Sequence, residues 1–142
     1  MQSADDSVAV RVSRAARALD RALDQALVAA GGSLPTWLVL QALDAGEHGT
    51  QAELARAVGV REPTLTHHLD ALERTGSVTR QRAAGDRRAS RVALTDDGRR
   101  LFVRLRRVAA GFDGQLTAGL GPDDVDRLRR LLIALVENAR PD

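Results

Sequence analysis

The feature that most constrains the fold is the stretch of residues 50–95, which has the pattern of two short helices, a tight turn and a β-hairpin. The first helix is expected to begin at Thr50, whose hydroxyl can accept a hydrogen bond from the amide of Glu53 in a capping box. Gly59 supplies the left-handed backbone conformation that a tight turn needs. Leucines at i, i+4 and i+7 within residues 62–75 then predict a second helix with one buried stripe. These features together predict a helix–turn–helix unit.

Two alternating segments predict the hairpin that follows. Residues 77–82 place Val78 inward and Thr79 outward, and residues 91–94 repeat the alternation. We expect residues 83–88 between them to form a flexible loop with arginines at its tip. A hairpin directly after a helix–turn–helix is the arrangement of a winged unit.

The rest of the chain predicts longer helices around this unit. Apolar residues recur at helical spacing in residues 7–29 and 34–43, after residue 96 and after residue 123. One tryptophan, two phenylalanines and no tyrosine leave a core of Leu, Val and Ala, which suits packed helices. The predicted fold class is mainly α with a small β-hairpin wing, in a single domain of residues 1–142.

The composition argues against several classes of protein. The absence of cysteine excludes disulfides, thiolate metal sites and cysteine nucleophiles. No apolar run approaches the ~20 residues of a membrane helix, and the first ten residues carry acids where a signal peptide has basic residues. The sequence has no glycine-rich phosphate loop, no nucleophile with a base and no buried carboxylate pair. We therefore expect a cytoplasmic protein that is not an enzyme and uses no cofactor.

Charge is strongly segregated along the chain. All 21 basic residues are arginine. Residues 74–107 hold eleven arginines against three aspartates, a local net charge of +8, whereas the remaining chain has ten arginines against sixteen acids, a net charge of −6. Arginine bias would explain the missing lysine but not this segregation. A focused positive face of this kind predicts a polyanionic partner such as double-stranded DNA.

The helix of residues 62–75 is predicted to be the one that enters a DNA groove. Because its leucines face inward, five residues near its start face outward, namely Glu62, Pro63, Thr64, Thr66 and His67. A helix N-terminus also presents free amides to phosphate. Threonines can contact phosphates or thymine methyl groups, and a histidine can donate to a base edge. The alternative for the threonines is a plain surface position, and His68 is expected to be half-buried. The predicted DNA contacts of this unit are Gln51, Arg61, Pro63, Thr64, Thr66 and His67.

Arginines of the hairpin are the second set of predicted DNA contacts. Arg87 and Arg88 are expected at the tip, where a guanidinium can enter the narrow minor groove of A·T-rich DNA. Arg80, Arg82 and Arg91 are predicted to contact phosphates. The alternative at the tip is a local surface salt bridge, worth about 0–1 kcal/mol.

A metal site is not predicted. His67 and Asp70 are one helical turn apart, but zinc takes three or four ligands. Besides the adjacent His68, the only other histidine is His48, in a loop.

The first and last helices predict self-association. Each carries a broad apolar stripe that a monomer built around a small winged unit would leave partly bare. A symmetric homodimer would cover both stripes. The alternative is a bundle formed within one chain.

Three segments resemble the MarR/SlyA family of winged helix–turn–helix regulators: QAELARAVGV, PTLTHHLDALERTGSV and GDRRASRVALTDDGR. The resemblance covers nearly the whole chain. It implies a winged unit at residues 34–95, dimerisation helices at residues 7–30 and 96–140, and a pseudo-palindromic operator bound usually by a repressor. It also implies that Arg88 inserts into the minor groove and that Asp86 orients it. The sequence departs from the family at His67, where relatives often carry arginine.

The same resemblance implies a small effector, often an aromatic anion. Trp37, with Arg14 or Arg17 nearby, could receive an aromatic carboxylate. The alternative for Trp37 is ordinary core packing. Two other functions stay open: a nonspecific architectural DNA binder, and a winged-helix protein-interaction module without DNA binding.

Overall fold

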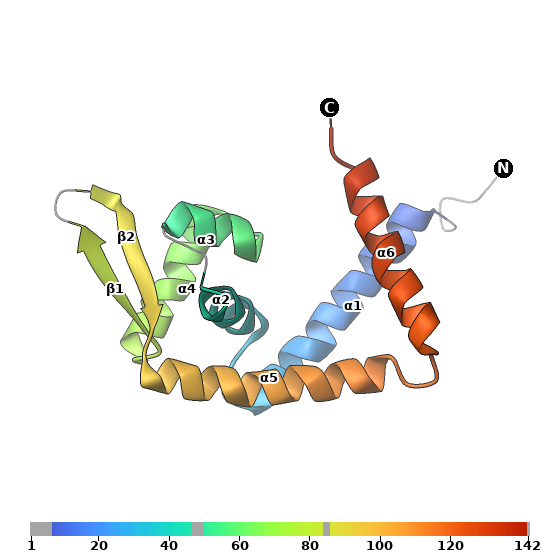
Figure 1. Ribbon diagram of the computed structural model, residues 1–142, viewed down its shortest axis with the longest axis horizontal. Coiled ribbons are helices and arrows are strands. Elements are labelled where there is room, and N and C mark those ends of the chain that lie inside the picture. The colour runs from blue at the N-terminus through green and yellow to red at the C-terminus, as the bar shows by residue number, and fades with distance from the viewer. Residues whose placement is uncertain (1–6, 47–49, 84–85, 142) are drawn as a thin grey trace. The chain divides into compact units, whose positions relative to one another are not determined.

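The computed structural model describes residues 7–46, 50–83 and 86–141; the side chains of residues 82–90 lie outside this description. It is mainly helical, with one two-stranded antiparallel hairpin, which confirms the predicted fold class (Figure 1). The chain divides into two compact units, Met1–Ala109 and Ala110–Asp142. In chain order the elements are α1 (Val8–Ala29), α2 (Leu34–Asp44), α3 (Gln51–Val58), α4 (Glu62–Arg74), β1 (Val78–Ala83), β2 (Asp86–Leu94), α5 (Asp96–Leu116) and α6 (Pro122–Asn138).

The core of the first unit is built mainly of leucine and valine, as the scarcity of aromatic residues predicts. Trp37 of α2 and Phe102 of α5 stack in it, with ring centroids 5.5 Å apart. Every element of the unit contributes to this core, so the hairpin and the short helices share one apolar interior. Its largest fully buried side chains are Leu27, Val39, Leu40, Leu54, Leu65, Leu69, Val78 and Leu105.

Local capping explains where the two helices of the helix–turn–helix begin and end. The Thr50 hydroxyl accepts a hydrogen bond from the Glu53 amide at 3.2 Å, which confirms half of the predicted capping box. Gly59 ends α3 in the left-handed conformation, with φ of 80°. α4 then starts with Pro63 in its first turn, where no intrahelical donor is lost.

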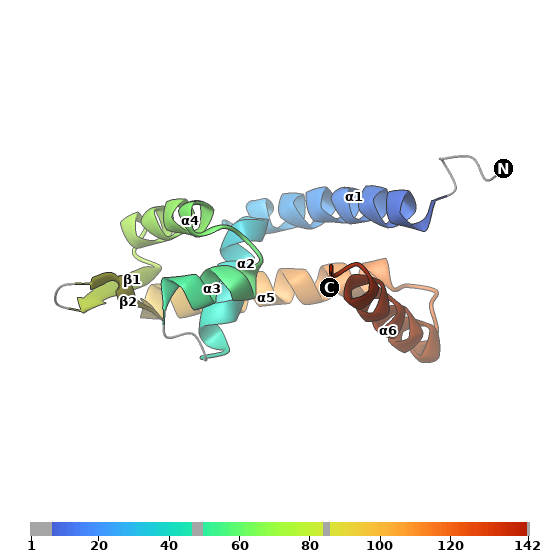
Figure 2. The ribbon, with the colours of Figure 1, turned by 90° about the horizontal axis from the view of Figure 1, so that it is seen from above.

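The hairpin is longer than the sequence suggests. In its register Val78 pairs with Leu94 and Ala83 with Asp86, with an irregularity between Gln81 and Ala83. The predicted loop of residues 83–88 was therefore wrong in extent, because strand pairing satisfies backbone groups that an open loop would leave to water. Figures 1 and 2 show the hairpin projecting beyond α2, α3 and α4 at the end of the unit opposite α1.

The base of the hairpin is locked to the start of α5. The Thr95 amide donates to the Ser77 carbonyl at 3.1 Å, and the Thr95 hydroxyl accepts from the Gly98 amide at 3.0 Å and donates to the Gly76 carbonyl at 2.5 Å. A Cβ on Gly98 would lie 2.0 Å from the Ser77 carbonyl oxygen. Only glycine permits this close approach, so the joint has little freedom.

The second unit contains α6 and the end of α5. None of the residues of α6 is buried. Its large apolar side chains are 39–59% exposed, namely Leu128, Leu131, Leu132, Ile133, Leu135 and Val136.

In the ranges that the structure describes, no single helix is long and apolar enough to cross a membrane. Only α1 and α2 taken together reach that length and composition, and they bend by 81° at the break between them.

Candidate nucleic-acid interface

α4 presents three distinct faces along its length. The inner face is buried, since Leu65, Leu69 and Leu72 are at most 5% exposed. Because these leucines pack into the core of their own unit, the rest of the helix surface is held in a defined orientation. The side chains of one other face are bound to α3 and to the hairpin, whereas those of the remaining face are exposed.

Thr66 and Gln51, both predicted to contact DNA, are bound to each other. The Gln51 side-chain amide donates to the Thr66 hydroxyl, which in turn donates to the Glu62 carbonyl at 3.0 Å. This pair joins the first residue of α3 to the middle of α4. The structure thus gives both residues a role in fixing the angle of the helix–turn–helix, and a DNA contact by either stays a prediction.

The outward face of α4 carries the other predicted contacts. Arg61, Pro63, Thr64 and His67 are all exposed. Arg74, which the sequence reasoning did not single out, is also exposed and lies seven residues after His67, on the same side of the helix. Its spacing was the signal that could have identified it.

His68 is half-buried, as predicted. Its ring lies 5.9 Å from that of His67. Burial, and to a lesser degree the neighbouring His67, lowers the pKa of His68 below its ordinary value. His68 therefore belongs to the packing of α4, and its folded environment disfavours the protonated ring.

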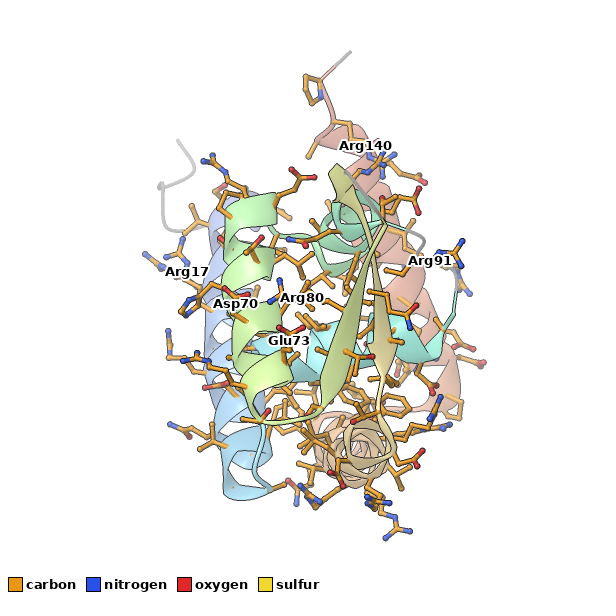
Figure 3. The ribbon with its side chains drawn as sticks, turned by 90° about the vertical axis from the view of Figure 1, so that its left-hand side faces the viewer. Arg17, Asp70, Glu73, Arg80, Arg91 and Arg140 are labelled. Atoms are coloured by element: carbon orange, nitrogen blue, oxygen red, sulfur yellow. The ribbon has the colours of Figure 1, made fainter. Side chains whose placement is uncertain are left out.

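Arg80, which is predicted to contact phosphate, is bound to carboxylates of its own chain. Its guanidinium pairs with Asp70 and with Glu73, the latter at 3.3 Å between Nε and Oε2, and its side chain is only 12% exposed. Figure 3 shows Arg80 between α4 and β1, facing both carboxylates. Strand alternation explains this, because Arg80 lies on the same face of β1 as the buried Val78. The structure thus gives Arg80 a role in the joint between helix and hairpin, and a phosphate contact by Arg80 stays a prediction.

Arg91 is placed differently from Arg80. It is exposed, pairs in register with Gln81, and lies at the far side of the hairpin from Arg80 (Figure 3). Its predicted phosphate contact is open to test.

The remaining hairpin residues are described only by their backbone. Arg82 lies at the register irregularity of β1, and Asp86, Arg87 and Arg88 form the start of β2, next to the turn. Their side chains lie outside the described structure, so the minor-groove contact stays a prediction.

The predicted effector residues are not brought together. Trp37 is 8% exposed and stacked on Phe102, which is the core-packing alternative. Arg14 and Arg17 are exposed on α1. Arg17 precedes Leu27, the α1 residue of the same core, by ten residues, or about 15 Å of helix. An effector contact by Trp37, Arg14 or Arg17 stays a prediction.

Groups of three or more potential metal ligands do not occur among the described residues. His48 lies outside the described residues. His67 and Asp70 lie on α4 as predicted, but Asp70 is bound to Arg80.

Comparison with known proteins matches this geometry to one family. The MarR family model matches residues 33–90, from the cap of α2 into β2. The transcriptional regulator MosR of M. tuberculosis, solved in complex with DNA, is 30% identical, with 96% of this chain and 100% of that chain covered and a TM-score of 0.75. The chain belongs to the MarR family.

Two further structures agree. The transcriptional regulator PA3341 is 32% identical, with 93% of this chain and 97% of that chain covered and a TM-score of 0.79. The transcriptional repressor CouR of Rhodococcus jostii RHA1, bound to a 23-mer DNA duplex, is 27% identical, with 96% and 98% covered and a TM-score of 0.84. As a MarR-family protein the chain is a DNA-binding transcription regulator, and members of this family are regulators rather than enzymes.

Proposed function

We propose that this MarR-family protein is a repressor that binds a pseudo-palindromic operator as a homodimer. The observation that carries the proposal is the outward face of α4, where Pro63, Thr64 and His67 are exposed while the opposite face is buried in the core of the same unit. A rigidly held helix with one free polar face is what major-groove readout requires. The DNA-bound structures of MosR and CouR support the same use of the fold.

The homodimer is supported by apolar surface at both ends of the chain. Val8, Val12 and Leu19 of α1 are 37–59% exposed, and α6 has no buried residue. Apolar faces of this extent are costly in water and are normally covered by a partner. A two-fold dimer would place two copies of α4 in successive major grooves, about 34 Å apart.

On DNA we assign distinct roles to helix and hairpin. Thr64 and His67 would read base edges or contact phosphates, with Arg61 and Arg74 at the backbone. The start of β2 would carry Arg88 to the minor groove, where the electrostatic potential is most negative over A·T-rich sequence. Base specificity would come from α4, and register and salt dependence from the arginines.

We also propose that a small aromatic anion modulates the dimer. Such a ligand would act by favouring one spacing of the two α4 helices over another. Trp37 is the single tryptophan and the chain has no tyrosine, so its fluorescence reports on the Trp37–Phe102 stack. A titration with aromatic carboxylates should change this emission in parallel with DNA release; no change with any acid that releases DNA would contradict a ligand near Trp37.

DNA titration at several salt concentrations tests the main proposal. A labelled duplex from upstream of the protein's own gene should bind about 10³-fold or more tighter than random sequence. Its log affinity should fall steeply with log salt, as several phosphate contacts require. Equal affinity for all sequences would leave an architectural binder, and no binding at low salt would leave a protein-interaction module.

Arg88→Ala tests the hairpin assignment. The variant should weaken binding to that duplex about tenfold, because one minor-groove contact is lost. Size-exclusion chromatography with light scattering should show the same oligomeric state as the parent protein. Unchanged affinity would overturn the role of Arg88.

A further inference from the structure

One polar ridge of α4 is fully engaged by its neighbours. Thr66, Asp70 and Glu73 stand at i, i+4 and i+7, so they lie on one flank of the helix. Thr66 is bound by Gln51 of α3, and the two carboxylates are bound by Arg80 of β1. This flank therefore joins the helix to the elements on either side of it.

The two carboxylates are a problem for a helix that approaches DNA. Asp70 and Glu73 are 53% and 47% exposed, so their charge is not hidden by burial. Asp70 lies one turn from His67, on the margin of the face that we assign to the groove. Unpaired, two carboxylates at this margin would repel the phosphates that the arginines attract.

Arg80 forms ion pairs with both carboxylates from a fixed position on the hairpin. Its third place in β1 and its pairing with Val92 put it on the inner face of the hairpin. The planar guanidinium binds Asp70 through Nη2 and Glu73 through Nε, a geometry that a lysine ammonium does not reproduce. Its side chain is 12% exposed, so the arginine is shielded from solvent although the two carboxylates are about half exposed.

We propose that Arg80 is a positioning residue for DNA binding: through Asp70 and Glu73 it sets the hairpin against α4 and neutralises that flank of the helix, without itself contacting a phosphate. The inference rests on the proposed DNA contacts of α4 and the hairpin. It predicts that the hairpin and α4 keep one fixed orientation relative to each other when they bind DNA. It also separates Arg80 from Arg91, which lies on the same hairpin but is free to meet the backbone.

The first test compares Arg80→Lys and Arg80→Gln with Arg91→Lys and Arg91→Gln in the full-length protein, using the labelled upstream duplex. Arg80→Lys keeps the positive charge but loses the planar guanidinium that binds both carboxylates. Affinity for DNA should therefore weaken about tenfold, with an unchanged slope of log affinity against log salt. Arg91→Lys should bind nearly as the parent, and Arg91→Gln should reduce the slope by about 0.9, the value of one phosphate contact. Parent-like affinity for Arg80→Lys, or a reduced slope for Arg80→Gln, would overturn the proposal.

The second test neutralises the two carboxylates in the parent protein and in the Arg80→Gln variant. Asp70→Asn with Glu73→Gln keeps a side-chain carbonyl acceptor for Arg80 at each position and removes two charges that repel phosphate. Affinity should therefore change by no more than about twofold when Arg80 is present. The same pair added to Arg80→Gln should restore at least about fivefold, because two unpaired carboxylates are removed. Equal effects in the two backgrounds would mean that Arg80 acts independently of these residues.

A readout without DNA keeps this inference separate from the proposed function. The Asp70 carboxyl pKa, which the hydrogen bond from Arg80 lowers, should rise toward its ordinary value in Arg80→Lys when followed by carbon NMR. Failure of the parent protein to bind DNA would refute the proposed function. An unchanged Asp70 pKa would refute the pairing itself. Circular dichroism spectra of all variants should match the parent, and Arg80→Lys, the mildest change, serves if Arg80→Gln does not fold.

Discussion

The amphipathic helices α4 and α6 differ in what covers their apolar side chains. α4 buries Leu65, Leu69 and Leu72 in the core of its own unit. α6 has a broader apolar face, yet none of its residues is buried. The same amphipathic sequence pattern can therefore bury its apolar side chains within one unit, as in α4, or leave them exposed, as in α6. α4 is consequently held in place with its outer face exposed, whereas the apolar face of α6 is left exposed.

The largest expected effect comes from placing a charge on the face of α6. Leu132→Glu should convert the proposed dimer to monomers and weaken operator binding about a hundredfold or more, since the two half-sites would no longer be bound together. Light scattering and DNA titration measure both effects. Arg130→Glu, on the opposite side of α6, is the matched control and should leave the dimer intact. A dimeric Leu132→Glu would break the contrast between the two helices.

Next in size is the effect of filling the joint between hairpin and α5. Gly98→Ala places a Cβ against the Ser77 carbonyl and should lower the free energy of unfolding by about 3 kcal/mol. Gly111→Ala in the same helix meets nothing within 4 Å and should raise it by about 0.5–1 kcal/mol. Urea denaturation measures both, and equal effects would show that the winged unit is less tightly locked than its contacts indicate.

A smaller pair of effects separates the two polar faces of α4. Thr66→Val removes the bond to Gln51 and should lower the free energy of unfolding by about 1 kcal/mol. Thr64→Val, on the exposed face, should leave stability unchanged while weakening DNA binding. Thermal unfolding and DNA titration of both variants test this division. The opposite pattern would exchange the roles assigned to the two threonines.

The smallest expected effect is a pH dependence of stability from His68. Because the folded state lowers the pKa of His68 below 6.5, the unfolded chain binds a proton more readily. The free energy of unfolding should therefore fall as the pH decreases through about 6.5. Melting temperatures between pH 7.5 and pH 5 would show it. His68→Gln should flatten this part of the profile, and an unaltered profile would place the titrating group elsewhere.

Much of the winged unit was predictable because its signals are local. The Thr50 cap, the Gly59 turn and the leucine spacing of α4 act within a few residues, and each is confirmed. The extent of the hairpin was not predictable, since its strands continue wherever cross-strand pairing is available. The residues 83–88 have loop-like composition, yet pairing extends to Ala83 and Asp86.

The candidate site was predictable in part. The exposure of Thr64 and His67 followed from the buried stripe of α4. The roles of Gln51 and Arg80 did not, because their partners lie fifteen and ten residues away in sequence. Strand alternation alone already placed Arg80 beside Val78 rather than with the outward Thr79, a signal that the count of hairpin arginines obscured.

The sequence by itself determined the order of helices and hairpin, the positive charge of residues 74–107 and the family, because periodicity, caps and motifs are properties of neighbouring residues. Only the tertiary structure decided which polar side chains are already bound. Folding brings Arg80 between Asp70 and Glu73 and joins Gln51 to Thr66. The sequence does not show that Arg80 is paired, because its partners come within hydrogen-bond distance of the guanidinium only when the chain folds.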